Sequence, residues 1–226
     1  ERMHERKYRM MSTLRMLRES VANGIDTVVA TPHFYAGEQT VEEFVSQRDA
    51  ALAQVRDACE RESLSVRIVP AAEVLVREGI SQLDLSPLCI EGTQCVMLEL
   101  PFMTPPAWLL EEIENIVFDQ KLVVMYAHLD RYMPWYSSED VAEITDIPGL
   151  LLQINAGSLL NRRACRHLQR GLPAVRRLVL GTDMHEPDVC VKHMEKAHNS
   201  LRRMAVGREW LEHIGRCEAA FKQNWQ

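Results

Sequence analysis

The chain has 226 residues, of which 46% are hydrophobic, and it carries a formal net charge of −6. This length fits one large domain or two small ones, and the apolar content is enough to bury a sizeable core. The acidic balance argues against a nucleic-acid partner, because binding to phosphates needs a basic face.

Six short apolar segments are predicted to be strands. Each is a nearly continuous run of Val, Leu, Ile and other apolar residues, which is typical of strands covered on both faces. In chain order they are residues 25–33 (IDTVVATPH), 66–73 (VRIVPAAE), 95–101 (CVMLELP), 122–128 (LVVMYAH), 150–157 (LLLQINAG) and 177–185 (RLVLGTDMH).

Amphipathic helical patterns separate most of these strands. The first precedes Gly24, which stands where a helix-terminating glycine belongs. The second begins with a capping box formed by Thr40 and Glu43. Alternating strands and helices predict a parallel sheet, open or closed into a barrel, with function at the carboxyl ends of the strands. Further apolar stripes span residues 109–117, 194–204 and 208–226.

The strand ends carry residues that bind metals. Five of the six predicted strands reach a His, Glu or Asp, and the sixth ends in the neutral Asn155. Because parallel strands share their carboxyl ends at one edge, these side chains are expected to meet there. Asp183 and His185 are two positions apart in an extended segment, so their side chains point to the same face. The set is His33, Glu73, Glu99, His128, Asp183 and His185.

Imidazole and carboxylate without thiolate suit Zn²⁺, Mn²⁺ or Fe²⁺. Carboxylates can bridge neighbouring ions, and such ions activate water and clamp the oxygens of a phosphate ester. The pattern therefore indicates hydrolysis of phosphoester bonds. A single His or Glu at a strand end is more often a capping or solvated residue, but six such residues at five strand ends favour a common site. The chain has no Cys-x5-Arg loop, no GxxxxGK[ST] and no HExxH.

Six motifs, in this order, resemble the CpsB/CapC-type tyrosine phosphatases of the PHP (polymerase and histidinol phosphatase) superfamily. They are GIDTVVATPHFYAG, AAEV, LELPF, YAHLDRY, QINAGSL and GTDMH. The resemblance runs from about residue 10 to 220 and implies one PHP-type metallophosphatase domain over residues 1–226. The implied α/β fold is a distorted (β/α)7 TIM-like barrel with a trinuclear metal centre at the strand ends.

By the same resemblance the six rim residues are metal ligands for two or three Mn²⁺ ions, with Zn²⁺ or Fe²⁺ as alternatives. Arg131, His128 and Asp183 are the implied catalytic residues. Arg131 would bind the substrate phosphate through its fork of donors, while a metal-bound hydroxide attacks phosphorus. The alternative for Arg131 is a surface ion pair with Asp130 or another neighbour.

The resemblance implies a protein-tyrosine phosphatase that acts on a bacterial tyrosine kinase controlling capsule or exopolysaccharide assembly. Aromatic walls at Phe34, Tyr35 and Phe102 would favour phosphotyrosine. The alternatives are a small-molecule phosphoesterase similar to histidinol phosphatase and a non-catalytic binding relative. Each of these functions is compatible with assembly of the chain into a homo-oligomer.

The six cysteines form no CxxC pair, which is typical of reduced thiols in a cytoplasmic protein. No apolar run reaches the roughly 18 residues of a membrane span, so no membrane insertion is expected.

The sequence departs from the family pattern in two places. The family opens with a strand ending in Asp-x-His-x-His, whereas the only early histidine here is His4 in a polar context. Six strands are found where the fold needs seven, so we expect the first strand to be missing from the sequence given. The alternative is a truncated or divergent member of the family, in which one metal position loses two ligands. The segment after GTDMH, residues 186–193, contains no arginine for the phosphate.

Overall fold

The computed structural model describes residues 2–161, 163, 165, 166, 168, 177–185, 191–204 and 207–224. Its strands are all parallel to the strands with which they pair. They are β1 (Thr27–Ala30), β2 (His33–Phe34), β3 (Arg67–Pro70), β4 (Glu73–Leu75), β5 (Cys95–Glu99), β6 (Val123–Tyr126), β7 (Leu151–Asn155) and β8 (Leu178–Gly181).

All six predicted strand segments are present, but each of the first two is split. The first becomes β1 and β2, with Thr31 and Pro32 between them, and the second becomes β3 and β4. Pro32, which has no backbone N–H, lies between β1 and β2, and Pro70 is the last residue of β3. The pairing nevertheless continues across the gap, since Ala71 N donates to Ala30 O at 2.9 Å and Glu73 N to Pro32 O at 3.0 Å.

The larger sheet has the order β2-β4-β5-β6-β7-β8, and β1 pairs with β3 beside it. If β1 with β2, and β3 with β4, are each taken as one interrupted strand, every connection leads to the neighbouring strand, as in a β/α barrel. Within the described residues no backbone ladder joins β8 to β1 or β2. The core between the strands and the helices that cover them includes the fully buried Val74, Val96, Leu98, Tyr126 and Ile154.

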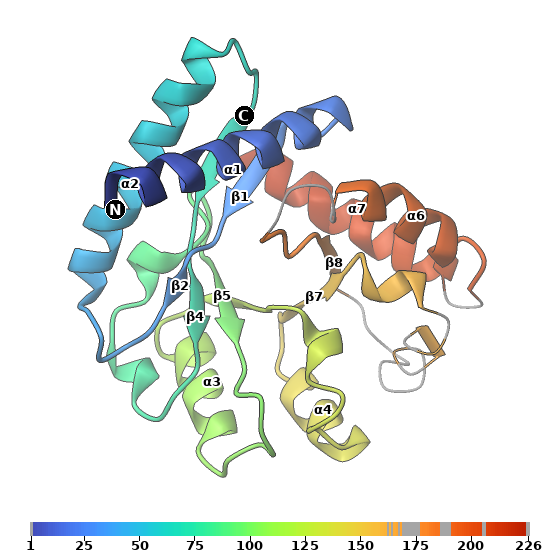
Figure 1. The fold of residues 1–226 in the computed structure, drawn as a ribbon. Coiled ribbons are helices and arrows are strands. Elements are labelled where there is room, and N and C mark those ends of the chain that lie inside the picture. Colours follow the sequence, from blue (N-terminus) through green and yellow to red (C-terminus); the bar gives the residue numbers. More distant parts are fainter. Residues whose placement is uncertain are drawn as a thin grey trace.

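The helices surround the sheet (Figure 1). They are α1 (Arg2–Ala22), α2 (Val41–Arg61), α3 (Leu109–Phe118), α4 (Ser138–Thr145), α6 (Val191–Leu201) and α7 (Gly207–Asn224). Helix α1 packs on α2, and α2 also contacts β3. Helix α6 packs on α7, and α7 also contacts β8.

The predicted capping box of α2 is confirmed. Thr40 Oγ1 accepts from Glu43 N at 3.2 Å, and Glu43 Oε2 accepts from Thr40 N at 2.9 Å. The last helix was predicted to run to residue 226, and residues 225–226 lie outside the described part of the chain. The sequence interpretation missed α4, although Ser137 and Asp140 form a second capping box at its start.

Two sequence expectations concern cysteines and membranes. Four of the five cysteines that the structure describes are buried and all five are free, while Cys190 lies outside the described residues. No helix in the described ranges is long and apolar enough to cross a membrane.

Candidate metal centre

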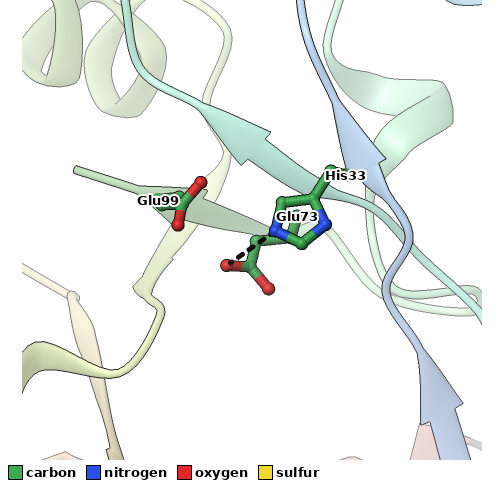
Figure 2. Close-up of side chains that lie close together, drawn as sticks. All are labelled: His33, Glu73 and Glu99. Carbon is green, nitrogen blue, oxygen red and sulfur yellow. Dashed lines mark ion pairs between the residues drawn. The ribbon is translucent and has the colours of Figure 1, made fainter. Parts of the chain in front are cut away.

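The strand ends bring three of the predicted ligands into one cluster. His33 begins β2 and lies opposite Glu73 in the register with β4, while Glu99 ends the neighbouring β5. One ligand atom from each of the three residues lies within 4.8 Å of those of the other two. Figure 2 shows these side chains, with His33 Nε2 4.0 Å from Glu73 Oε1. Both carboxylates are buried, and the imidazole is partly exposed.

His128 joins this cluster from the end of β6. Its side chain is buried, and its Nε2 lies 2.8 Å from Glu73 Oε1 and 3.6 Å from Glu99 Oε1. Its Nδ1 is the only buried side-chain polar atom in the described part of the chain without a hydrogen-bond partner. Two imidazoles and two carboxylates therefore meet at one place, and three of these four side chains are buried.

The electrostatics of this cluster favour a cation. Burial raises the pKa of the Glu99 carboxyl, and the neighbouring Glu73 carboxylate raises it further. Two like charges that are buried together are costly unless something neutralises them. The donor set of imidazole nitrogen and carboxylate oxygen is the one that Mn²⁺, Zn²⁺ and Fe²⁺ accept. The residues present thus fit a divalent metal ion.

Asp183 and His185 lie beside the cluster rather than inside it. His185 Nδ1 is 3.4 Å from Asp183 Oδ1, and the ring centroids of His185 and His33 are 6.2 Å apart. His185 is exposed, whereas the Asp183 carboxylate is mostly covered. Sequence reasoning placed all six residues at one rim; the structure brings four together and sets these two at the edge.

Two of the rim residues have an unusual backbone. His128 has a φ of 31° and Asp183 a φ of 49°, both in the left-handed region that non-glycine residues rarely adopt. Each such residue costs on the order of 1–3 kcal/mol and persists only where its surroundings fix it. Strain of this kind often accompanies functional sites, and here it aims two side chains at the rim.

Gln153 connects these two strained residues. It is buried in β7, and its Oε1 accepts a short hydrogen bond from His128 N. Its Nε2 donates to Asn155 Oδ1 at 2.9 Å, and Asn155 Nδ2 donates to Asp183 Oδ2 at 2.9 Å. A Cβ atom at Gly181 would overlap the Gln153 amide, so a larger residue there would displace Gln153 from its present hydrogen bonds. The sequence analysis missed Gln153, although it is the one polar residue inside the apolar run LLLQI.

Replacement of Gln153 by Met, which is similar in size, should weaken binding of Mn²⁺ by about 10–100-fold, as loss of a residue that orients ligands commonly does. The His128 N–H would lose its partner, and Asn155 would no longer be oriented toward Asp183. Calorimetric titration of the metal-free protein with Mn²⁺ measures the change. Unaltered affinity in a folded Gln153→Met variant would rule out this positioning role.

Arg131 lies at the outer side of the site, on the short 3-10 turn Leu129–Arg131 that follows His128. Its Nη1 is 3.5 Å from Asp183 Oδ2, and its guanidinium lies 4.8 Å from the ring centroid of Phe102. Asp130, the neighbour considered as its ion-pair partner, instead accepts from Asn155 N at 2.9 Å and Ser158 Oγ at 2.5 Å. Arg131 is 45% exposed, so it can meet a ligand.

Of the three expected aromatic wall residues, two lie at the site. The Tyr35 ring stacks on His33 at 5.6 Å, and the Phe102 ring stacks on His128 at 5.8 Å. Burial, followed by the charges of Glu99 and Glu73, raises the pKa of the Tyr35 hydroxyl. The prediction for Phe34 is wrong, because its side chain is fully buried against Phe44.

Comparisons with known proteins agree with this architecture. The model of a family described as "Capsular polysaccharide synthesis, CpsB/CapC" matches residues 6–220. No curated protein sequence matches the chain significantly.

Two solved structures are similar in fold. One comes from the crystal structures of YwqE from Bacillus subtilis and CpsB from Streptococcus pneumoniae, which are described as unique metal-dependent tyrosine phosphatases. Its TM-score is 0.69 and its sequence identity 20%, and the match covers 91% of this chain and 88% of that chain. The other is histidinol phosphate phosphatase from Lactococcus lactis, solved with zinc, L-histidinol and phosphate; it has a TM-score of 0.50 and 13% identity, over 84% of this chain and 86% of that chain. These likenesses confirm the predicted α/β fold of the PHP type.

Proposed function

The chain belongs to the CpsB/CapC family of capsular polysaccharide synthesis, and from this premise we propose that it is a metal-dependent phosphatase acting on phosphotyrosine in proteins. The observation that carries the proposal is the buried cluster of two imidazoles and two carboxylates with a partly exposed arginine beside it. A cation site next to a guanidinium is suited to the charge of a phosphate ester.

The metal would be held by His33, Glu73, Glu99 and His128, with Asp183 and His185 supplying further ligands. When bound, such ions lower the pKa of water and offset the negative charge of the phosphoryl group. We propose two or three Mn²⁺ ions. Zn²⁺ is the metal in the similar histidinol phosphate phosphatase structure and is the first alternative to test.

The protein's own residues provide the binding and the orientation. The Arg131 guanidinium can give two parallel hydrogen bonds to phosphate oxygens, because its donors form a fixed fork. Its present ion pair with Asp183 is long, at 3.5 Å, so a phosphate can displace it at small cost. Asp183, which accepts a hydrogen bond from Asn155, would accept a proton from the attacking water. His128 contacts both buried carboxylates and keeps them in position.

We infer that the substrate is a phosphorylated tyrosine on a bacterial tyrosine kinase that controls capsule or exopolysaccharide assembly, and that the reaction takes place in the cytoplasm. The family's role in capsular polysaccharide synthesis supports the pathway. The similarity in fold to YwqE and CpsB, which are described as tyrosine phosphatases, supports the substrate class.

A comparison of three substrates tests this proposal. The protein is loaded with Mn²⁺, and phosphate release is measured from a phosphotyrosine peptide, a phosphoserine peptide of the same sequence, and histidinol phosphate. We expect the highest kcat/KM for the phosphotyrosine peptide. A higher value for histidinol phosphate would identify a small-molecule phosphoesterase, and no release from any of the three by the metal-loaded protein would identify a binding relative.

A further inference from the structure

Two loops next to the metal centre are tied into one wall. One follows β5 and carries Phe102, and the other follows β6 and carries Arg131 and Trp135. The buried hydroxyl of Tyr132 accepts from Leu100 N at 2.9 Å, and the Tyr136 hydroxyl donates to Pro101 O at 3.2 Å. Because both bonds cross from one loop to the other, the wall is set before any ligand arrives.

The ring of Phe102 lies at the centre of this wall. It stacks on His128 at 5.8 Å, carries the Arg131 guanidinium at 4.8 Å, and meets the Trp135 ring edge-on at 5.6 Å. Arg131 and Trp135 therefore contact the same ring, which also stacks on His128 of the metal centre.

Trp135 is exposed although it packs edge-on against Phe102. It is 44% exposed, and Met103, which follows Phe102, is 56% exposed. These are two of the six large apolar side chains that are exposed in the described part of the chain. Rigid aromatic side chains that are held by neighbours and face solvent are typical anchors for a ligand, since little conformational entropy is lost on binding.

We propose that Trp135, supported by Phe102, contacts the aromatic ring of the phosphorylated tyrosine and determines the preference for aryl over alkyl phosphates. This inference rests on the proposed phosphatase function and adds the residue that recognises the substrate. Edge-to-face or offset contact with a tyrosine ring is favourable between aromatic groups. A phosphoserine side chain has no ring and is shorter, so it gains nothing from Trp135.

The test is a Trp135→Ala variant loaded with Mn²⁺. We expect KM for the phosphotyrosine peptide to rise about tenfold with kcat little changed, the size of one aromatic pair. Turnover of the phosphoserine peptide of the same sequence should not change. Phe118→Ala is the matched control, because Phe118 is a 54% exposed aromatic residue at the C-terminal end of α3. This substitution should leave the turnover of both peptides unchanged.

Binding provides a readout that does not depend on turnover. Calorimetry of phenylphosphonate and methylphosphonate should show weaker binding of the phenyl compound alone in Trp135→Ala, and Trp135→Phe should restore most of it. An equal loss for both compounds, or no change for either, would overturn this inference and leave the phosphatase function standing. If the metal-loaded wild type released phosphate from neither peptide, the proposed function would fail, whereas the phosphonates would still decide the role of Trp135.

Discussion

Replacement of Glu73 by Gln should reduce metal-dependent phosphate release by on the order of 10³-fold, since metal ions supply several kcal/mol of charge stabilisation in such reactions. Glu73 is the residue at the centre of the cluster. Its Oε1 lies 2.8 Å from His128 Nε2 and 4.0 Å from His33 Nε2, and Glu99 lies on its other side. Glutamine has the same size but no charge, and it cannot bridge two ions.

The same variant should be at least as stable as the wild type in the absence of metal. Glu73 and Glu99 are both buried, and burial together with the Glu73 charge raises the pKa of Glu99. Removal of one charge relieves the repulsion between the two carboxylates. A substitution that raises stability and lowers activity is expected where buried charges serve function. In the wild type Mn²⁺ should raise Tm, because a ligand that binds only the folded state stabilises it, and this rise should be lost in Glu73→Gln.

Phosphate release and Tm with and without Mn²⁺ measure both effects. Glu60→Gln is the control, since Glu60 is an exposed residue near the end of α2, a helix of 21 residues and therefore about 30 Å long. It should behave as the wild type in both measurements. A Glu73→Gln variant that retained full turnover and the full Mn²⁺-induced rise in Tm would exclude Glu73 as a ligand.

The second large effect is expected at Arg131. Arg131→Ala should lower kcat/KM for the phosphotyrosine peptide by about 10²–10³-fold, the usual loss when one donor to the transition state is removed. Arg131→Lys should recover only part of this, because lysine keeps the charge but has neither the planar fork nor the stacked contact with Phe102.

A measurement of metal binding distinguishes the role of Arg131 from that of the metal ligands. Arg131 contacts Asp183 but none of the four clustered side chains through an ion pair, so Arg131→Ala should bind Mn²⁺ nearly as tightly as the wild type. Arg61→Ala, an exposed arginine at the far end of α2, is the control. Loss of Mn²⁺ binding in Arg131→Ala, or unchanged kcat/KM, would contradict a role in holding the phosphate.

The strands and the rim could be predicted because one physical pattern determines both. A strand that is buried on both faces must be almost wholly apolar, so the first polar residue at its end marks where the sheet meets solvent. In a parallel sheet those ends share one edge, which is why His33, Glu73, Glu99 and His128 were identified together.

Other features could not be predicted, or were misread. The left-handed backbone at His128 and Asp183 has no sequence signal, because it is imposed by contacts such as those of Gln153. Phe34 could have been assigned correctly: successive residues of a strand point to opposite faces, so His33 and Tyr35 face the site and Phe34 faces the core.

The central claim is that this rim is a metal centre that hydrolyses phosphotyrosine. The most direct measurement removes bound metal with a chelator, restores Mn²⁺ in steps, and follows phosphate release from a phosphotyrosine peptide together with the number of ions bound. The account predicts no release without metal and a rise in turnover that saturates as two or three ions bind. Release that persists after complete removal of metal, or saturated binding of Mn²⁺ without any release, would contradict it.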